Sequence, residues 1–164
     1  MKNLLYINRE IHPLDILEDI AECENYTFTR PSPDELDLSI SGKNCNYNIN
    51  FNCNNKLEGI HVALFFDTKI PQYRLDEVYK LTIKINELIW LGHFDVWTNE
   101  LLLFRYNLLL SGGVLPTTSQ CQSLFKHIMD IADKYYPSFQ YVIWGGNKAD
   151  EAITNAIFTT IGES

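Results

Sequence analysis

Cysteine and histidine are the side chains of this sequence that could most readily serve catalysis. Cys121 falls in the first turns of a predicted helix, where the helix dipole can lower a thiol pKa and create a nucleophile. It shares an apolar stripe with Leu124 and Phe125, which favours a buried, inert thiol. His93 and Asp95 lie on one side of a predicted strand, as a catalytic or a structural pair. We predict no catalytic residue, and a small thiol- or His/Asp-dependent enzyme stays an alternative.

The spacing of possible ligands indicates neither a metal nor a phosphate site. The cysteines form no CxxC pair and stand at Cys23, Cys45, Cys53 and Cys121. The histidines fall on separate elements, at His12, His61, His93 and His127. Cys45 and Cys53 share a strand face but lie too far apart to bind one ion, at ~3.3 Å per residue. The segment Trp144-Gly145-Gly146 lacks the rest of a phosphate loop and indicates a helix end. We predict no metal and no cofactor.

Composition predicts one globular domain over residues 13–164, preceded by an N-terminal arm over residues 1–12. The chain has 164 residues, of which 46% are hydrophobic and 21% charged, as in ordinary folded domains. The net charge of −8 argues against nucleic acid or an anionic membrane as a partner. No apolar run reaches the length of a membrane span, and the N-terminus lacks the pattern of a signal peptide. We therefore expect a cytoplasmic protein with reduced thiols.

The apolar stretch over residues 85–113 is the expected centre of the fold. The spacing of leucine, isoleucine and valine from Leu75 onward predicts a long helix that stops at Gly92. We expect Trp90 to be a core residue where this helix meets the next strand, with Trp90→Ala costing about 3–5 kcal/mol. Two strands follow, joined by a two-residue turn at Asn99-Glu100, which would set Arg105 opposite Phe94. A buried Arg105 needs a carboxylate or an aromatic ring beside it.

The other elements predict an α+β fold with a mainly antiparallel sheet. Pro13 opens a first helix, and residues 25–30 and 36–40 suit strands. Residues 45–54 alternate apolar side chains with asparagines, so one strand face is all asparagine, either solvated or a surface for a protein partner. Residues 57–66 predict a central strand covered on both faces. Thr117 caps a helix that Pro137 breaks or kinks; residues 139–144 are helix or strand, with helix favoured, and a last helix follows Asn147.

The second predicted strand of the hairpin is apolar on both faces, and one layer of helices can cover only one of them. Its other face needs a further cover, either the helix after Thr117 or a second copy of the chain. We therefore predict a homodimer with the hairpin over residues 94–110 at or near its interface. The candidate interface residues are Phe94, Val96, Leu101, Leu103 and Leu109.

Several strings together resemble the YbjN-domain family. They include Trp90-Leu91-Gly92-His93-Phe94-Asp95, Phe104-Arg105, Tyr135-Tyr136-Pro137, Phe139-Gln140 and Trp144-Gly145-Gly146. The resemblance runs from Pro13 almost to the end of the chain. It departs from the family at Tyr106-Asn107, where His-Ala is expected, and in the asparagine-rich strand.

Members of this family are described as bacterial sensory transduction regulators. The family fold is similar to that of type III secretion chaperones, which are small acidic α+β proteins that tend to form dimers. The resemblance implies a non-enzymatic, chaperone-like interaction module that acts on another protein by surface contact, and it carries no catalytic residues. A sensor of a small ligand stays a further alternative.

Overall fold

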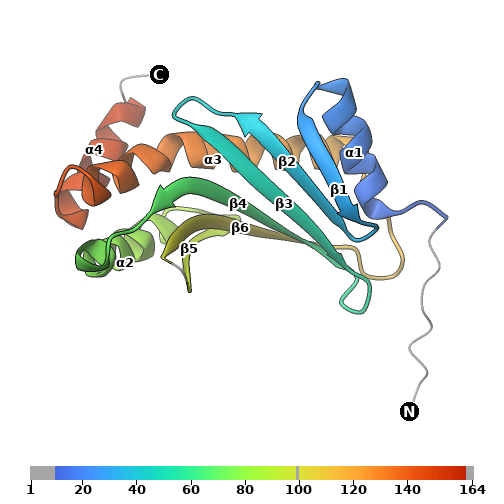
Figure 1. Cartoon of the computed structure of the whole chain (residues 1–164), viewed down its shortest axis with the longest axis horizontal. Helices are drawn as coiled ribbons and strands as arrows, with labels where there is room; N and C mark the ends of the chain where they lie inside the picture. Colours follow the sequence, from blue (N-terminus) through green and yellow to red (C-terminus); the bar gives the residue numbers. More distant parts are fainter. Residues whose placement is uncertain (1–9, 99, 162–164) are drawn as a thin grey trace, which may run out of the picture.

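The computed structural model describes residues 10–98 and 100–161, and Figure 1 shows their arrangement. Most of the predicted N-terminal arm, residues 1–9, lies outside the described residues. The elements follow in the order α1 (Pro13–Cys23), β1 (Thr27–Ser32), β2 (Glu35–Ser41), β3 (Asn46–Asn54), β4 (Gly59–Lys69), η1 (Gln72–Arg74), α2 (Leu75–Asn86), β5 (His93–Trp97), β6 (Leu101–Leu109), α3 (Thr118–Ile143) and α4 (Ala149–Ile161). The predicted α+β class is confirmed. No helix in the described part of the chain is long and apolar enough to cross a membrane.

The strands form one six-stranded antiparallel sheet in the order β1-β2-β3-β4-β6-β5. Hairpins join β1 through β4 in sequence, and β6 pairs with β4 on one side and β5 on the other. The alternation in β3 is confirmed: Tyr47, Ile49 and Phe51 are buried while the asparagines face away. In this strand order β1 and β5 are the two edges of the sheet.

The core lies on one face of the sheet, under α3. This long helix crosses behind the strands (Figure 1). Near its start Phe125 packs on Phe51 of β3, with ring centroids 5.5 Å apart. Farther along, Tyr136 stacks on Phe66 of β4 at 4.6 Å, and Phe139 meets Phe94 of β5 at 4.9 Å. Aromatic side chains thus tie one helix to the strands across the sheet, and such contacts add to the free energy gained from burial.

Helix α3 continues through Pro137, so the predicted break is wrong; the alternative of a kink stays a prediction. Proline lacks the N–H that would bond to the carbonyl of residue 133, so that carbonyl should lose its partner. The side-chain amide of Asn44, in the β2–β3 turn, donates to the Asp133 carbonyl at 3.1 Å instead. The favoured helical reading of residues 139–144 is confirmed as far as Ile143.

Strand β4 is central in order but is covered by helices on one face only. Its buried side includes Ile60, Val62 and Leu64, whereas His61 and Phe65 point to the opposite face and are half-buried. The expectation of a strand covered on both faces was wrong. The helices lie on the core side (Figure 1), so the opposite face of the sheet, here called the open face, has no helical cover within the described chain.

The hairpin of β5 and β6 differs from the expected two-residue turn. Trp97 pairs with Leu101, so residues 98–100 connect the strands, and Arg105 lies opposite His93. Glu100 adopts a left-handed φ of 62°, as in three-residue hairpin loops. Asn99 itself lies outside the described residues. The extra turn residue explains why the predicted pairing of Arg105 with Phe94 was wrong.

Candidate functional site

The open face of the sheet brings side chains from all six strands into rows. One row runs across the sheet through Thr27, Ser39, Asn48, Phe65, Leu103 and Asp95. The next row runs through Thr29, Asp37, Asn50, Ala63, Arg105 and His93. Both rows are polar on β1–β3; on β4 and β6 they hold Phe65, Leu103, Ala63 and Arg105, and on β5 they end in Asp95 and His93. The face therefore has two chemically different halves.

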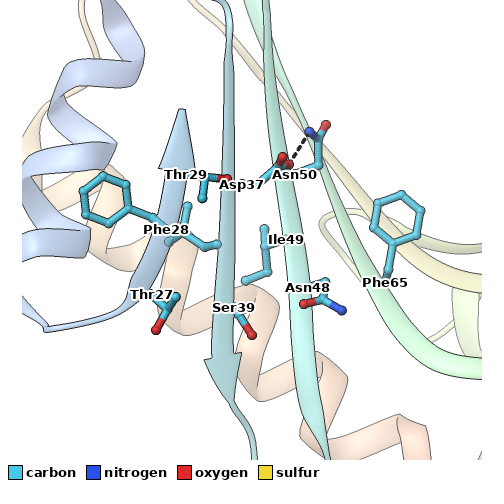
Figure 2. Close-up of a pocket in the computed structure, with 10 residues that line it drawn as sticks. Thr27, Phe28, Thr29, Asp37, Ser39, Asn48, Ile49, Asn50 and Phe65 are labelled. Carbon is cyan, nitrogen blue, oxygen red and sulfur yellow. Dashed lines mark hydrogen bonds between the residues drawn. The ribbon is translucent and has the colours of Figure 1, made fainter. Parts of the chain in front are cut away.

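The polar half holds a shallow pocket of ≈360 Å³, shown in Figure 2. Phe65 stands at its β4 side, with the polar side chains of β1–β3 beside it. Asn50 donates to the Asp37 carboxylate at 2.8 Å. The predicted asparagine face thus contributes to a pocket as well as to a solvated surface.

Arg105 organises the other half of the open face. Its guanidinium forms an ion pair with Asp95, Nη1 to Oδ2 at 3.2 Å, and lies 5.9 Å from the Trp97 ring centroid. The prediction of a carboxylate or aromatic partner is confirmed, with both present. Arg105 Nε is buried and has no hydrogen-bond partner among the described residues. Burial lowers the pKa of His61, and the nearby Arg105 and His93 lower it further.

A second surface lies at the other side of the hairpin, where residues 87–92 form the Trp90 loop. Helix α2 ends at Asn86, and the Trp90 side chain is 93% exposed. The expected core position of Trp90 was therefore wrong, and with it the large predicted cost of Trp90→Ala. Leu88 and Leu91 beside it are also exposed.

The Trp90 loop is fixed at both ends by hydrogen bonds to the body of the domain. Asn86 accepts from the Phe94 N–H at 2.8 Å and donates to the Phe94 carbonyl at 3.0 Å. His127 of α3 lies 2.9 Å from the Leu91 carbonyl through Nε2. Gly92 has a left-handed φ of +80°, but the helix ends at Asn86, so the predicted stop at Gly92 was wrong. Because both ends of the loop are fixed, its backbone loses little conformational entropy when a partner binds.

A groove of ≈440 Å³ lies next to the Trp90 loop, between β6 and the first turns of α3. Leu91, Tyr106, Leu108 and Leu124 supply its apolar walls, and His127 borders it. A protruding tryptophan and an apolar groove therefore share one side of the molecule.

The possible catalytic groups are not arranged for catalysis. Cys121 has 0% exposure, and burial raises the pKa of its thiol to about 11, so the thiolate is scarce at neutral pH. Asp95 is bound to Arg105 and accepts from the Val96 N–H at 2.8 Å, so its carboxylate is already occupied beside His93. These contacts support the reading of both sites as structural.

One group of possible metal ligands comes together that the sequence did not indicate. Ligand atoms of His12, Asp34 and Cys53 all lie within 4.8 Å of one another. His12 Nδ1 accepts from the Leu14 N–H at 3.2 Å and faces Arg30 Nη2 at 3.3 Å, so its lone pair is in use. The ring proton then belongs on Nε2, 3.0 Å from Asp34 Oδ1. A metal ligand needs a lone pair on Nε2, so this arrangement fits a brace between α1 and the β1–β2 turn better than a metal site.

The five predicted interface residues differ in where the structure places them. Phe94 and Leu103 are buried within the chain, Val96 and Leu101 are half-buried, and Leu109 is exposed. Leu103 lies on the open face, yet Phe65 and Trp97 meet across β6 with their rings 6.0 Å apart. Their contact explains how Leu103 reaches 1% exposure without a further layer. The Trp90 loop and its groove were missed, because spacing alone could not separate a core tryptophan from an exposed one.

The described residues form a small α+β domain with an exposed apolar loop, a groove beside it and a shallow pocket on the open face. A YbjN family profile, described as "Putative bacterial sensory transduction regulator", matches residues 13–141, and the chain belongs to this family. The fold is similar to the crystal structure of YbjN, "a putative transcription regulator from E. coli", at a TM-score of 0.53 and 14% identity, covering 73% of this chain and 85% of that one. No curated protein matches. The likeness to type III secretion chaperones stays a prediction.

Proposed function

We propose that this chain is a non-enzymatic, cytoplasmic regulatory module that acts by contact with another protein through the Trp90 loop and its groove. The observation that carries the proposal is the exposed indole of Trp90, in a loop whose two ends are hydrogen-bonded to the domain. Its family, described as sensory transduction regulators, supports a regulatory role. Tryptophan in a central, well-packed contact is a common source of binding free energy.

The free energy that covering the Trp90 indole would contribute favours a binding role for this residue. An indole presents about 200 Å² of surface, and covering it at roughly 25 cal/mol per Å² contributes about 5 kcal/mol before the entropy cost of association. In the isolated chain the indole stays in water, and this free energy of burial is not gained. Because Trp90 is 93% exposed, it contributes little to packing within one chain.

The first occupant that we propose for this surface is a second copy of the chain. A protruding side chain beside an apolar groove is self-complementary: a twofold axis between them sets each Trp90 into the groove of the other copy. The Trp90 loop directly precedes β5, so this homodimer keeps the hairpin over residues 94–110 near its interface. It uses little of the open face, which remains accessible.

Sedimentation equilibrium at roughly 10 μM tests the dimer, since this concentration populates complexes of moderate affinity. We expect twice the 19.0 kDa mass of the chain, and a shift to monomer in Trp90→Ser. Trp144→Ser is the matched control, because Trp144 is 62% exposed at the far end of α3. Both variants should melt within about 2 °C of the unmodified chain, since neither fills a core.

These experiments test the homodimer separately from the use of the Trp90 loop as a binding surface. A single 19.0-kDa species for the unmodified chain contradicts the homodimer. A pull-down from the native cytosol then tests for a different protein partner. Proteins captured by the Trp144→Ser variant but not by the Trp90→Ser variant would support contact through the Trp90 loop. Equal capture by both variants contradicts the proposed surface.

A further inference from the structure

The pocket on the polar half of the open face carries a set of side chains with unused hydrogen-bonding capacity. Among the described residues, the hydroxyls of Thr27 and Ser39 and the amide of Asn48 have no hydrogen-bond partner, although these three lie in one row. Each can donate as well as accept. Asn50 is held by Asp37, which fixes the amide and leaves the second oxygen of the carboxylate as an acceptor. Asn50 and Asp37 are thus fixed before any ligand arrives, whereas the exposed side chains of Thr27, Ser39 and Asn48 are free to turn toward one.

The charge of the lining excludes several classes of ligand. No lysine, arginine or histidine is among the ten residues that line the pocket, so phosphates and carboxylates find no cation there. Asp37 is the one acidic residue, and it already accepts from Asn50. A neutral ligand that both donates and accepts hydrogen bonds fits this lining best.

An aromatic wall completes the pocket. Phe65 follows Asn48 in the same row, and Trp97 supports its ring at 6.0 Å. Figure 2 shows the Phe65 ring standing beside the polar side chains of β3. The negative face of an aromatic ring attracts the weakly positive C–H groups of a neighbouring molecule. A ligand with hydroxyls on its edge and C–H groups on its face uses both parts of the pocket.

We propose that this pocket binds a neutral sugar, with one pyranose ring against Phe65 and its hydroxyls bonded to Ser39, Asn48 and Asp37. The volume of ≈360 Å³ lies at the lower end of the usual range for small-molecule sites, as one or two rings require. An extended peptide is a poorer match. Peptides gain main-chain bonds at the edge of a sheet; β1 is such an edge, but β2 and β3, which carry Ser39, Asp37 and Asn48, are paired on both sides. The site is separate from the Trp90 loop and does not rest on the proposed dimer.

The test is a titration of the full, uniformly ¹⁵N-labelled chain followed by its backbone amide resonances. The probes are maltose, cellobiose and lactose, each up to roughly 50 mM, well above the ~1 mM dissociation constant expected of a shallow site. At least one of them should give saturable shifts that gather on β1, β2, β3 and Phe65. Asn48→Ala should weaken that binding by about fivefold, since one hydrogen bond is worth about 1 kcal/mol.

Asn46→Ala is the matched control, because Asn46 is exposed on the same face of β3 but outside the pocket. It should bind the sugar as the unmodified chain does. Ser39→Ala provides a second variant at an exposed position and should also weaken binding. The absence of saturable shifts with all three sugars overturns the proposal, as does unchanged binding by Asn48→Ala. Saturable shifts at this pocket from a neutral peptide, with none from the sugars, would overturn it in favour of a peptide site.

Discussion

Gly92→Ala is the substitution whose effect can be worked out most fully from the geometry. Gly92 has a φ of +80°, and a Cβ there would lie 2.4 Å from Phe104 Cζ and 2.7 Å from the Arg105 carbonyl oxygen. The left-handed backbone costs an alanine about 1–2 kcal/mol, and forcing an atom into packed surroundings adds about 1–3 kcal/mol. The free energy of unfolding should fall by about 2–5 kcal/mol, which lowers Tm by about 4–20 °C in a chain of this size.

Gly112→Ala isolates the steric part of that cost. Gly112 has nearly the same φ, +84°, but an added Cβ meets nothing within 4 Å. It should lose only the backbone part, about 1–2 kcal/mol. Urea unfolding followed by far-UV circular dichroism gives both values. Equal losses in the two variants would refute the close approach of Gly92 to β6 and, with it, the position of the Trp90 loop.

Two further predictions concern titratable groups. A disulfide reagent should modify the exposed Cys23 in the native chain at neutral pH but reach Cys121 only on unfolding. The Cys121 thiol is buried, and its pKa is raised to about 11. Fast labelling of Cys121 in the native chain would instead support the alternative of a thiol-dependent enzyme. The folded chain lowers the pKa of His61, so the unfolded chain binds the proton first and stability should fall as pH drops below about 6.5. His61→Gln should remove part of this loss in melts between about pH 7 and 5, and an unchanged pH dependence would show that His61 is unperturbed.

Local patterns in the sequence predicted the elements that depend on local physics. Thr117 and Gln120 form the expected capping box, with both reciprocal bonds present, at 3.1 and 2.8 Å. The alternation of β2 and β3 placed their buried residues correctly, because a period of two leaves each strand only two choices of face. Cys121 was correctly assigned to the core from its helical spacing.

The errors arose where a distant residue decides the outcome. Helix α2 ends at Asn86, whose side chain bonds to Phe94 rather than continuing the helix, whereas the apolar periodicity predicted a helix as far as Gly92. Pro137 was expected to break or kink its helix; the helix is unbroken, and Asn44 of the β2–β3 turn donates to the Asp133 carbonyl that proline leaves without a partner. The pocket on the open face depends on the order of the strands across the sheet, which no pattern along the chain states. Its asparagines were the visible signal, and their partners on β1 and β4 could not be found from sequence.

The contact of Asn86 with Phe94 also limits how this protein can assemble. β5 is an edge strand, and its unpaired main-chain groups would otherwise accept a strand from another molecule. Asn86 occupies both the N–H and the carbonyl of Phe94, and Asp95 occupies the N–H of Val96. At this edge the sheet cannot be extended by copies of itself without breaking those bonds. Association on this side of the molecule is therefore expected to use side chains rather than strand pairing, which removes one common route to sheet-edge aggregation.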